Sequence, residues 1–387
     1  MESDNKLFLL DAYALIYRAY YAFIKNPRIN SKGFNTSAIL GFVNTLEEVL
    51  KKENPTHIGV AFDPAGPTFR HEAFEQYKAQ REETPEAIRL SVPIIKEIIR
   101  AYRIPILEVA GYEADDVIGT LATEAGRQGI ITYMMTPDKD YGQLVSDKVF
   151  MYRPKHTGGF EVMGVDEVKA KFDIQSPAQV IDMLGLMGDS SDNIPGCPGV
   201  GEKTAQKLIA EFGSIENLLE HTDQLKGALK TKVETNREMI TFSKFLATIK
   251  IDVPIQLDMD SLVREQADED SLRQIFEELE FRTLIDRVLK KENAGNGITT
   301  PTGNKTAAEK SNLAPLPLFP EEGGAVQGDL FANFTGNEPG EAKNSNLATL
   351  ETLNCDYQLI DTEEKRTKII QKLLTSKILS LDTETTG

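Results

Sequence analysis

The sequence predicts an α/β fold, in which a mainly parallel sheet is flanked by helices and is followed by an all-helical segment. Short apolar runs alternate with stretches of helical period from residue 6 to about residue 155. Such alternation is typical of βαβ units. From about residue 165 to residue 290 the strand signals vanish and helices follow one another. We therefore expect two folded domains, at residues 1–165 and 166–290.

Four apolar runs supply the expected strands, and they read KLFLL, HIGVAF, PILEVAG and ITYMMTP. Residues 12–23, 36–53 and 83–102 have apolar side chains at helical spacing, and we expect helices there. In the later segment, Gly213 is placed to end one helix and Ser214 to cap the next.

The composition changes beyond residue 290. Residues 291–355 are rich in Gly, Asn, Thr and Pro, which is typical of a disordered linker. Residues 356–387 have the pattern strand, helix, strand, and such a unit cannot bury a proper core alone. We interpret 356–387 as the truncated start of another domain, and the chain as a piece of something larger.

Acidic side chains stand where the expected strands end. Asp11 follows the first run, Asp63 the second and Asp138 the fourth. Because the carboxyl ends of parallel strands form the ligand crevice of an open sheet, we expect these groups to meet at one rim. Five segments contribute the full set: Asp11, Asp63, Glu113, Asp115, Asp116, Asp138, Asp140, Asp189 and Asp192.

Nine like charges can share a crevice only if cations neutralise them. Oxygen-only ligands favour Mg²⁺ or Mn²⁺ over zinc, and two such ions roughly 3.5–4 Å apart are the usual apparatus for phosphodiester hydrolysis. A helix cap is the alternative for any single acid, but not for the whole set. We expect one ion at Asp11, Asp63, Glu113 and Asp115, a second ion at Asp138, Asp140, Asp189 and Asp192, and Asp116 in an outer position.

The composition limits the class of protein. The net charge of −17 would disfavour a nucleic-acid partner, but the nine crevice acids contribute much of it. No apolar run has membrane length, and the amino terminus lacks a signal pattern. Cys197 and Cys355 are isolated thiols and the four histidines are scattered. These features predict a cytoplasmic protein without a zinc site.

Six stretches of the chain resemble, in the same order, the N-terminal 5′ nuclease domain of bacterial DNA polymerases I, a relative of the flap endonucleases. They are LLDAYALIYRAYYA, VAFDPAGPTFRHE, YKAQR, GYEADDVIGTLA, TPDKDYGQLV and MGDSSDNIPGCPGVGEKTA. The likeness covers roughly residues 5–290. It implies a monomeric, Mg²⁺-dependent 5′–3′ exonuclease and flap endonuclease, with the nine acids as its metal site. Its substrates would be 5′ flaps, nicks and RNA primers on DNA, in primer removal and excision repair.

The resemblance also implies contacts with DNA. In FEQYKAQR, an expected helix, Tyr77, Lys78 and Arg81 would share one side. The family places this region in an arch over the active site, where Lys78 and Arg81 contact the scissile phosphate and Tyr77 stacks on a base. A solvated basic face is the alternative. Arg18 is a further candidate for a phosphate contact.

The stretch GCPGVGEKTAQKLIAEFG resembles the family's helix–hairpin–helix module, which grips the DNA duplex downstream of the cut. Gly199 and Gly201 would let the hairpin backbone approach phosphates, with Lys203, Thr204 and Lys207 at the start of the next helix. The family holds a K⁺ ion at the hairpin carbonyls. An ordinary tight turn is the alternative for this pattern alone.

Two features lie near the carboxyl terminus. Asp382 and Glu384 are two apart on an expected strand, and they resemble the first motif of a 3′–5′ exonuclease site whose other acids are missing. Gln327, Leu330 and Phe331 resemble a short peptide that binds the bacterial sliding clamp. Docking of these apolar residues on a neighbouring domain is the alternative.

Other functions fit the sequence less well. A haloacid-type phosphatase needs a second Asp two residues after the first, where this chain has Tyr13, and a dinucleotide-binding domain needs a glycine-rich turn after the first strand. A PIN-type ribonuclease would share the acidic crevice but lack the GVGEK hairpin. A DNA-binding scaffold with an inactive metal site stays open as an alternative, although no acid of the set is missing.

Overall fold

The computed structural model describes residues 5–155 and 159–289, together with residues 362, 365 and 367. The chain divides into two units, residues 1–335 and 336–387, and every element given below belongs to the first. The predictions for 291–355 and 356–387 therefore lie outside the described residues, as do those for Gln327, Leu330, Phe331, Asp382 and Glu384.

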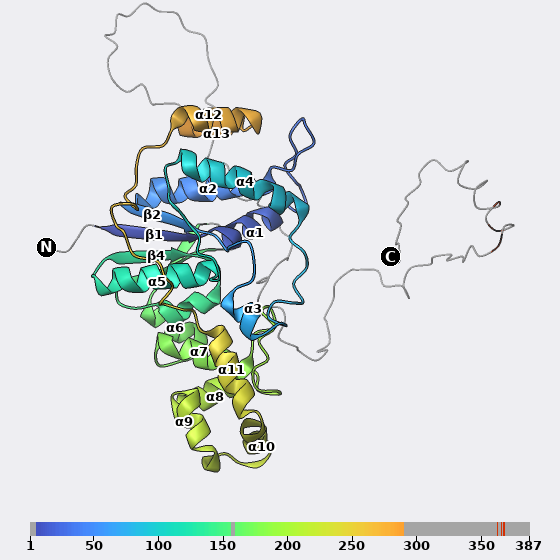
Figure 1. Ribbon diagram of the computed structural model, residues 1–387, viewed down its shortest axis with the longest axis vertical. Helices are drawn as coiled ribbons and strands as arrows, with labels where there is room; N and C mark the ends of the chain where they lie inside the picture. The colour runs from blue at the N-terminus through green and yellow to red at the C-terminus, as the bar shows by residue number, and fades with distance from the viewer. Residues whose placement is uncertain (1–4, 156–158, 290–361, 363–364, 366, 368–387) are drawn as a thin grey trace, which may run out of the picture. The chain divides into compact units, whose positions relative to one another are not determined.

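A six-stranded sheet in the order β3-β2-β1-β4-β5-β6 lies between helices in the first unit (Figure 1). All neighbouring strands pair in parallel except β5 and β6, which are antiparallel. The α/β class and the four predicted strands are thus confirmed, whereas the antiparallel edge was not predicted. The strands are β1 Lys6–Asp11, β2 His57–Ala61, β3 Ile106–Leu107, β4 Ile131–Met135, β5 Val149–Pro154 and β6 Phe160–Met163.

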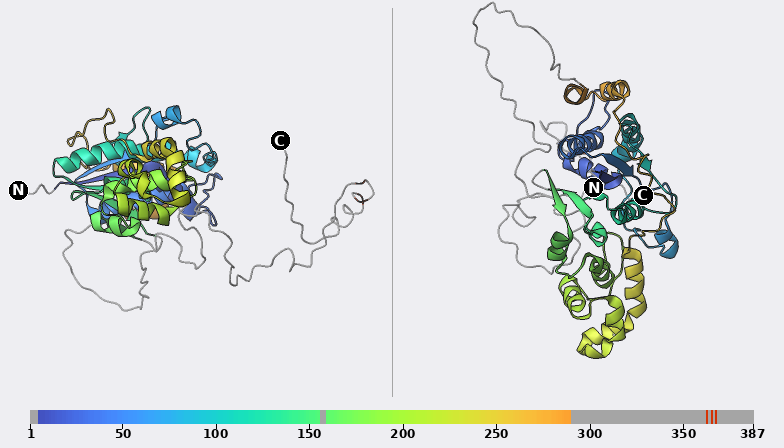
Figure 2. Two further views of the ribbon diagram at one scale, coloured as in Figure 1. Left: turned by 90° about the horizontal axis from the view of Figure 1, so that it is seen from below. Right: turned by 90° about the vertical axis from the view of Figure 1, so that its left-hand side faces the viewer.

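Helices cover both faces of the sheet (Figures 1 and 2). One apolar cluster joins alternate residues of β1 and β2, such as Phe8 and Val60, to α1, α2 and α4. The other cluster joins Leu7 and Leu9 to α5 and to the later helices between residues 180 and 247, here called the helical module. This alternation follows from the two-residue period of a strand. The flanking helices are α1 Ala12–Ala22, α2 Ser37–Glu48 with a π-helical turn Val49–Glu53, α3 Phe69–Ala73, α4 Glu86–Ala101, α5 Ala114–Arg127 and α6 Val165–Phe172.

The helical module consists of α7 Val180–Met187, α8 Glu202–Phe212, α9 Ile215–Glu220, α10 Gly227–Thr235 and α11 Arg237–Ala247. Gly213 ends α8 with φ 80°, and the Ser214 side chain accepts a hydrogen bond from the Asn217 N–H at the start of α9. Both sequence predictions are confirmed. Within the described residues, short 3₁₀ turns lie at Lys139–Leu144, Pro177–Gln179 and Thr222–Gln224.

Helices α12 Glu269–Glu278 and α13 Arg282–Leu289 return to the sheet. Leu272, Phe276 and Leu284 are buried in the cluster that holds α1, α2 and α4, and not in the helical module. The segment 166–290 is therefore divided between the module and the sheet face. Of the helices in the described ranges, none combines the length and the apolar character that crossing a membrane requires.

Candidate active site

The predicted acids come together beside the carboxyl ends of β1, β2 and β4. Asp11 ends β1 and accepts a hydrogen bond from the Ala14 N–H at 3.1 Å, so it also caps α1. Asp63 follows β2 and accepts from the Ala114 N–H at 2.7 Å, at the start of α5. Asp138 accepts from the Asp140 N–H at 3.0 Å. Each of these backbone bonds goes to one carboxylate oxygen, Oδ1, of the acid.

Burial makes this group of acids reluctant to ionise. Burial, with Asp63 nearby, raises the pKa of Asp11 to about 7. Burial also raises the pKa of Asp63 and of Asp138 above the ordinary range. For Asp115 and Asp140 burial, and then a neighbouring carboxylate, raises the pKa well above that range. Acids in such surroundings are poised to exchange protons for a metal cation.

The acids fit a hard divalent cation. Asp115 Oδ1 and Asp140 Oδ1 are buried without any hydrogen-bond partner, although Asp115 Oδ1 lies 3.9 Å from the Arg70 guanidinium. Buried oxygens without a hydrogen bond are expected where the partner is a bound ion. Oxygens of Glu113, Asp115 and Asp116 lie within 4.8 Å of one another. Such an all-carboxylate set selects Mg²⁺ or Mn²⁺ over softer metals. Among the described residues, the predicted second group does not form an equally tight set. In that group, Asp189 and Asp192 each pair with a basic side chain.

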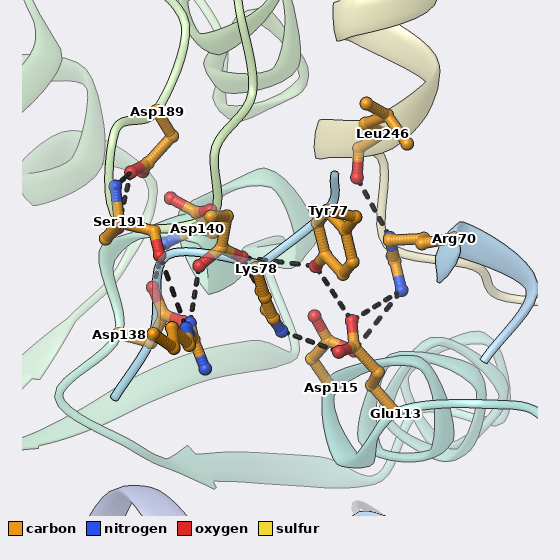
Figure 3. A network of polar contacts seen from close by, with 12 residues as sticks. Arg70, Tyr77, Lys78, Glu113, Asp115, Asp138, Asp140, Asp189, Ser191 and Leu246 are labelled. Carbon is orange, nitrogen blue, oxygen red and sulfur yellow. Dashed lines mark hydrogen bonds and ion pairs between the residues drawn. The ribbon is translucent and has the colours of Figure 1, made fainter. Parts of the chain in front are cut away.

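Arg70, on α3, holds the acids at the start of α5 in place, and sequence analysis missed it. Its side chain is 1% exposed. It donates to Glu113 Oε2 at 3.0 Å and to both oxygens of Asp116 at 2.8 Å. The same guanidinium donates to the Leu246 carbonyl oxygen in α11 at 2.9 Å (Figure 3). It also donates to the carbonyl oxygen of Thr248, directly after α11, at 2.8 Å. Arg70 therefore ties the metal site to the helical module.

Asp116 is occupied by these contacts. Its side chain is 0% exposed, and besides Arg70 it accepts from the backbone N–H groups of Lys250 at 2.8 Å and Glu113 at 3.1 Å. A carboxylate so fully engaged is suited to holding Glu113 and α11 in place rather than to binding an ion directly. This arrangement agrees with the outer position expected for Asp116.

The segment Gln76–Arg81, here called the gate segment, lies over the acids but is not the helix predicted from its sequence. It consists of turns, and Lys78 has the left-handed φ of 56°. Lys78 Nζ lies 2.6 Å from Glu113 Oε1 and 3.6 Å from Asp192 Oδ2. Arg81 pairs with Asp192 Oδ1 at 2.5 Å. Burial alone would raise the pKa of Glu113, but Lys78 and Arg70 hold it below the ordinary value.

Tyr77 is not placed as expected. The side chain is 3% exposed, and its hydroxyl donates to Glu113 Oε2 at 2.9 Å (Figure 3). The same hydroxyl lies 3.1 Å from Asp192 Oδ2. A ring buried in this way presents no face for a base, so the expected stacking is wrong for this arrangement. Tyr77 instead supplies a hydrogen bond shared between acids of the two predicted groups.

Three further side chains that the sequence analysis missed touch the acids. Asp11 Oδ2 accepts from the Tyr141 hydroxyl at 3.1 Å and from Thr136 Oγ1 at 3.3 Å. Lys139 Nζ pairs with Asp189 Oδ2 at 3.1 Å. Thr136, Lys139 and Tyr141 all lie within or beside the stretch TPDKDYGQLV, so only their proximity to the predicted acids could have indicated them.

Arg18 lies on α1, where its guanidinium donates to the Lys155 carbonyl at 3.1 Å. Burial lowers the pKa of Arg18 to about 10, so the group remains a cation at neutral pH. Its contact with DNA remains a prediction.

The expected hairpin connects α7 to α8. Gly199 has φ 75°, a left-handed backbone conformation that favours glycine, and a Cβ there would displace the end of the Lys232 side chain. Gly201 has an extended backbone that any residue could adopt, and the space beside it is open. Lys203 and Lys207 are exposed on α8, with Thr204 half-buried between them. This face is thus accessible to a polyanion.

Lys232, on α10, is a cation at the hairpin that the sequence analysis did not single out. Its Nζ lies 3.4 Å from the carbonyl oxygen of Gly199. Positive charge is therefore already present at one of the hairpin carbonyls. Its position next to Gly199 results from folding of the module and has no local signal in the sequence.

The raised pKa values predict that Mg²⁺ stabilises the protein more at neutral pH than in acid. The folded pKa of Asp11 is about 7 against an ordinary value of 3.8, so the folded protein keeps a proton that the unfolded chain releases. The free energy of unfolding of the metal-free protein should therefore fall as the pH rises between these values. A bound cation replaces the proton, so its stabilising effect should grow over the same interval.

Melting temperatures with saturating Mg²⁺ and with EDTA, at about pH 5 and about pH 7.5, measure this effect. The variant Asp11→Asn, which cannot titrate at this position, should show a smaller pH dependence. An equal shift by Mg²⁺ at both pH values would contradict the assignment.

Two family models match the chain. Residues 6–173 match the 5′–3′ exonuclease N-terminal resolvase-like domain, and residues 175–270 match the 5′–3′ exonuclease C-terminal SAM fold.

Curated relatives include two DNA polymerases I. The protein from Bacillus caldotenax is 42% identical over 287 residues, which are 73% of this chain and 32% of the relative. The protein from Bacillus subtilis (strain 168) is 43% identical over 291 residues, which are 74% of this chain and 33% of the relative. The chain thus spans about a third of the length of these relatives.

Solved structures share the fold. The 5′-exonuclease of T5, described with bound divalent zinc ions, matches with a TM-score of 0.53 and 21% identity over 72% of this chain and 99% of the other. The catalytic core of Rad2 in complex with a DNA substrate matches with a TM-score of 0.51 and 19% identity, over 73% of this chain and 93% of the other. The chain therefore shares its fold with these two structures.

Proposed function

Because the chain belongs to the 5′–3′ exonuclease family, we propose that it is a divalent-metal-dependent 5′ nuclease that cuts DNA at 5′ flaps, nicks and 5′ ends. One observation carries the proposal: carboxylates from separate elements converge in a buried site, where oxygens of Asp115 and Asp140 have no hydrogen-bond partner. The basic gate segment lies directly over them. An anionic phosphodiester could take the place of these carboxylates as the partner of Lys78 and Arg81.

The metal site would hold two Mg²⁺ or Mn²⁺ ions. Asp11, Asp63, Glu113 and Asp115 would hold one ion and Asp138, Asp140, Asp189 and Asp192 the other, with Asp116 in its outer position. When bound, such ions activate water and stabilise the leaving oxygen. The protein's own part is to fix the acids, through Arg70 and Tyr141, and to exclude other ligands from a site that is largely buried.

The gate segment would bind and orient the scissile phosphate. Lys78 and Arg81 are the catalytic cations, because positive charge aimed at the developing negative charge lowers the barrier to phosphoryl transfer. Burial would lower the pKa of Lys78, but Asp192 and Glu113 raise it, so the group is charged at neutral pH. Arg18 would contact a neighbouring phosphate.

The helical module would grip the duplex. The exposed Lys203 and Lys207, with Thr204 and the open backbone at Gly201, present donors and charge to consecutive phosphates. A K⁺ ion at the hairpin carbonyls belongs to this proposal, and Lys232 lies at the carbonyl of Gly199 beside it.

The longer relatives suggest a wider role. As part of a DNA polymerase I, the nuclease would remove RNA primers and damaged DNA ahead of synthesis, as a monomer in the cytoplasm. Gln327, Leu330 and Phe331 would bind a sliding clamp with modest affinity, since a peptide without a core loses conformational entropy when it binds.

A cleavage assay tests the function. A DNA with a labelled 5′ flap should be cut at the base of the flap in the presence of Mg²⁺ and should remain intact with EDTA. A single-stranded RNA of the same length serves as the second substrate. A PIN-type ribonuclease would cut this RNA, whereas the proposed nuclease should prefer the DNA flap. Binding of the flap without cleavage in Mg²⁺ or Mn²⁺ would favour the inactive scaffold and contradict the proposal.

The variant Lys203→Ala tests whether DNA binding and the cleavage step depend on different residues. We expect weaker binding to duplex DNA and a salt dependence reduced by about one phosphate contact, because the ammonium no longer displaces a counterion. The variant Lys78→Ala should instead slow single-turnover cleavage of prebound substrate. Fluorescence anisotropy at several salt concentrations and quenched-flow cleavage measure the two effects. Slower chemistry with unchanged affinity in Lys203→Ala would show that these roles are misassigned.

A further inference from the structure

The gate segment is joined to a second segment that is distant in sequence. Residues Asp189–Asn193, here called the acid loop, carry two of the predicted metal ligands and follow α7. Backbone bonds between Asp189 and Ile194 close the loop, at 2.9 Å and 2.8 Å. Four hydrogen bonds to backbone carbonyls connect the segments: Lys78 N to Asp192 O at 3.0 Å, Gln80 Nε2 to Ser190 O at 2.5 Å, Arg81 Nε to Ser191 O at 3.2 Å, and Asn193 Nδ2 to Gln76 O at 2.6 Å.

Two of the donors belong to side chains that carry no charge. Gln80 is exposed and Asn193 is half-buried, and neither contacts a carboxylate of the site in the described structure. An amide near solvent can bond to water almost as well as to a carbonyl, so these bonds add little to the stability of the fold. Their effect is geometric, because they fix one segment against the other.

The backbone on both sides of this junction is strained. Lys78 has φ 56° and Asn193 has φ 58°, the left-handed conformation that side chains other than glycine rarely adopt. Such conformations persist where the surroundings over-determine them, and they concentrate at functional sites. At these two positions the Lys78 ammonium group bonds to Glu113 and the Asn193 amide bonds to the gate segment.

We propose that Gln80 and Asn193 are positioning residues for the nuclease reaction. They hold the gate segment to the acid loop, so that the phosphate-binding cations Lys78 and Arg81 keep a fixed place relative to the metal ligand Asp192. The inference rests on the proposed nuclease function. The positions of the phosphate and of the metal ion would then be fixed by one rigid unit. A small displacement of the gate segment relative to the acid loop would slow the reaction without weakening binding to the duplex.

The test uses the full chain and the variants Gln80→Ala, Asn193→Gly and the double variant. Glycine keeps the left-handed backbone of Asn193 accessible and removes only the amide. Gln128→Ala is the matched control. Gln128 directly follows α5, and the substitution removes an exposed side-chain amide that donates a hydrogen bond to Glu124. For each protein we would measure single-turnover cleavage, the Mg²⁺ concentration at half-maximal rate, affinity for flap DNA in EDTA, and melting temperature.

We expect the double variant to cleave about 10- to 100-fold more slowly than the unmodified chain, with a higher Mg²⁺ midpoint. Affinity in EDTA and melting temperature should be unchanged, and Gln128→Ala should match the unmodified chain in every measurement. An unchanged rate, or a lower rate that appears only together with lost affinity or lower melting temperature, would overturn the proposal. A different result, no cleavage by the unmodified chain, would contradict the proposed nuclease function itself.

Discussion

Replacing Asp115 by Asn should abolish cleavage while leaving the protein folded. Asp115 Oδ1 is buried without a hydrogen-bond partner, and its neighbours Glu113 and Asp116 are both engaged by Arg70. Loss of a metal ligand should remove on the order of 3–5 kcal/mol of transition-state stabilisation, or on the order of 10²- to 10⁴-fold in rate. The same result is expected for Asp138→Asn. Single-turnover cleavage of a flap substrate measures the loss.

The fold should survive because each substitution removes one charge from a crowded group. Burial raises the pKa of Asp115 well above its ordinary range, so an uncharged amide is no worse there than a carboxylate without its ion. Asp147→Asn is the matched control, since Asp147 is exposed. Near-full Mg²⁺-dependent cleavage by Asp115→Asn or Asp138→Asn would sink the metal assignment.

Replacing Arg70 by Ala should destabilise the protein by about 3–5 kcal/mol, the range for removing one partner of a buried ion pair. The substitution leaves Asp116 buried without its counterion, and it leaves the carbonyls of Leu246 and Thr248 without their donor. Equilibrium unfolding in urea measures the change in the free energy of unfolding.

Arg103→Ala is the control for this loss. Arg103 pairs with Glu265 at 3.3 Å, but both side chains are more than half exposed, at 55% and 59%. We expect the free energy of unfolding of Arg103→Ala to fall by less than about 1 kcal/mol. If Arg70→Ala also lowered the free energy of unfolding by less than about 1 kcal/mol, the buried network around Arg70 would not be what holds the helical module to the site.

The sequence predicted the features that local patterns determine. A buried strand such as β1 is a continuous apolar run, and Asp11 at its end is marked both by the run and by the helix that follows. Parallel pairing then brings the acids of different strands to one rim without further information. For the same reason the cap at Ser214 and the helix end at Gly213 were predictable, because a few neighbouring residues decide them.

Features that depend on distant contacts could not be predicted in this way. The gate segment has a helical pattern, but its partners Ser190, Ser191 and Asp192 lie about 110 residues away and hold it in turns. Arg70 gains its role only when folding brings the end of α11, 176 residues later, against it. Tyr77 was expected at the surface and is buried for the same reason, since the acids it contacts come from two other segments.

The central claim is that the converging carboxylates are ligands of divalent cations. Diffraction from crystals soaked in MnCl₂, recorded at the manganese absorption edge, tests it most directly. We predict anomalous peaks bonded to Asp115 and to Asp140, in the unmodified chain, and loss of the first peak in Asp115→Asn. An absence of peaks at these acids under saturating Mn²⁺, with Lys78 still paired to Glu113, would contradict the account.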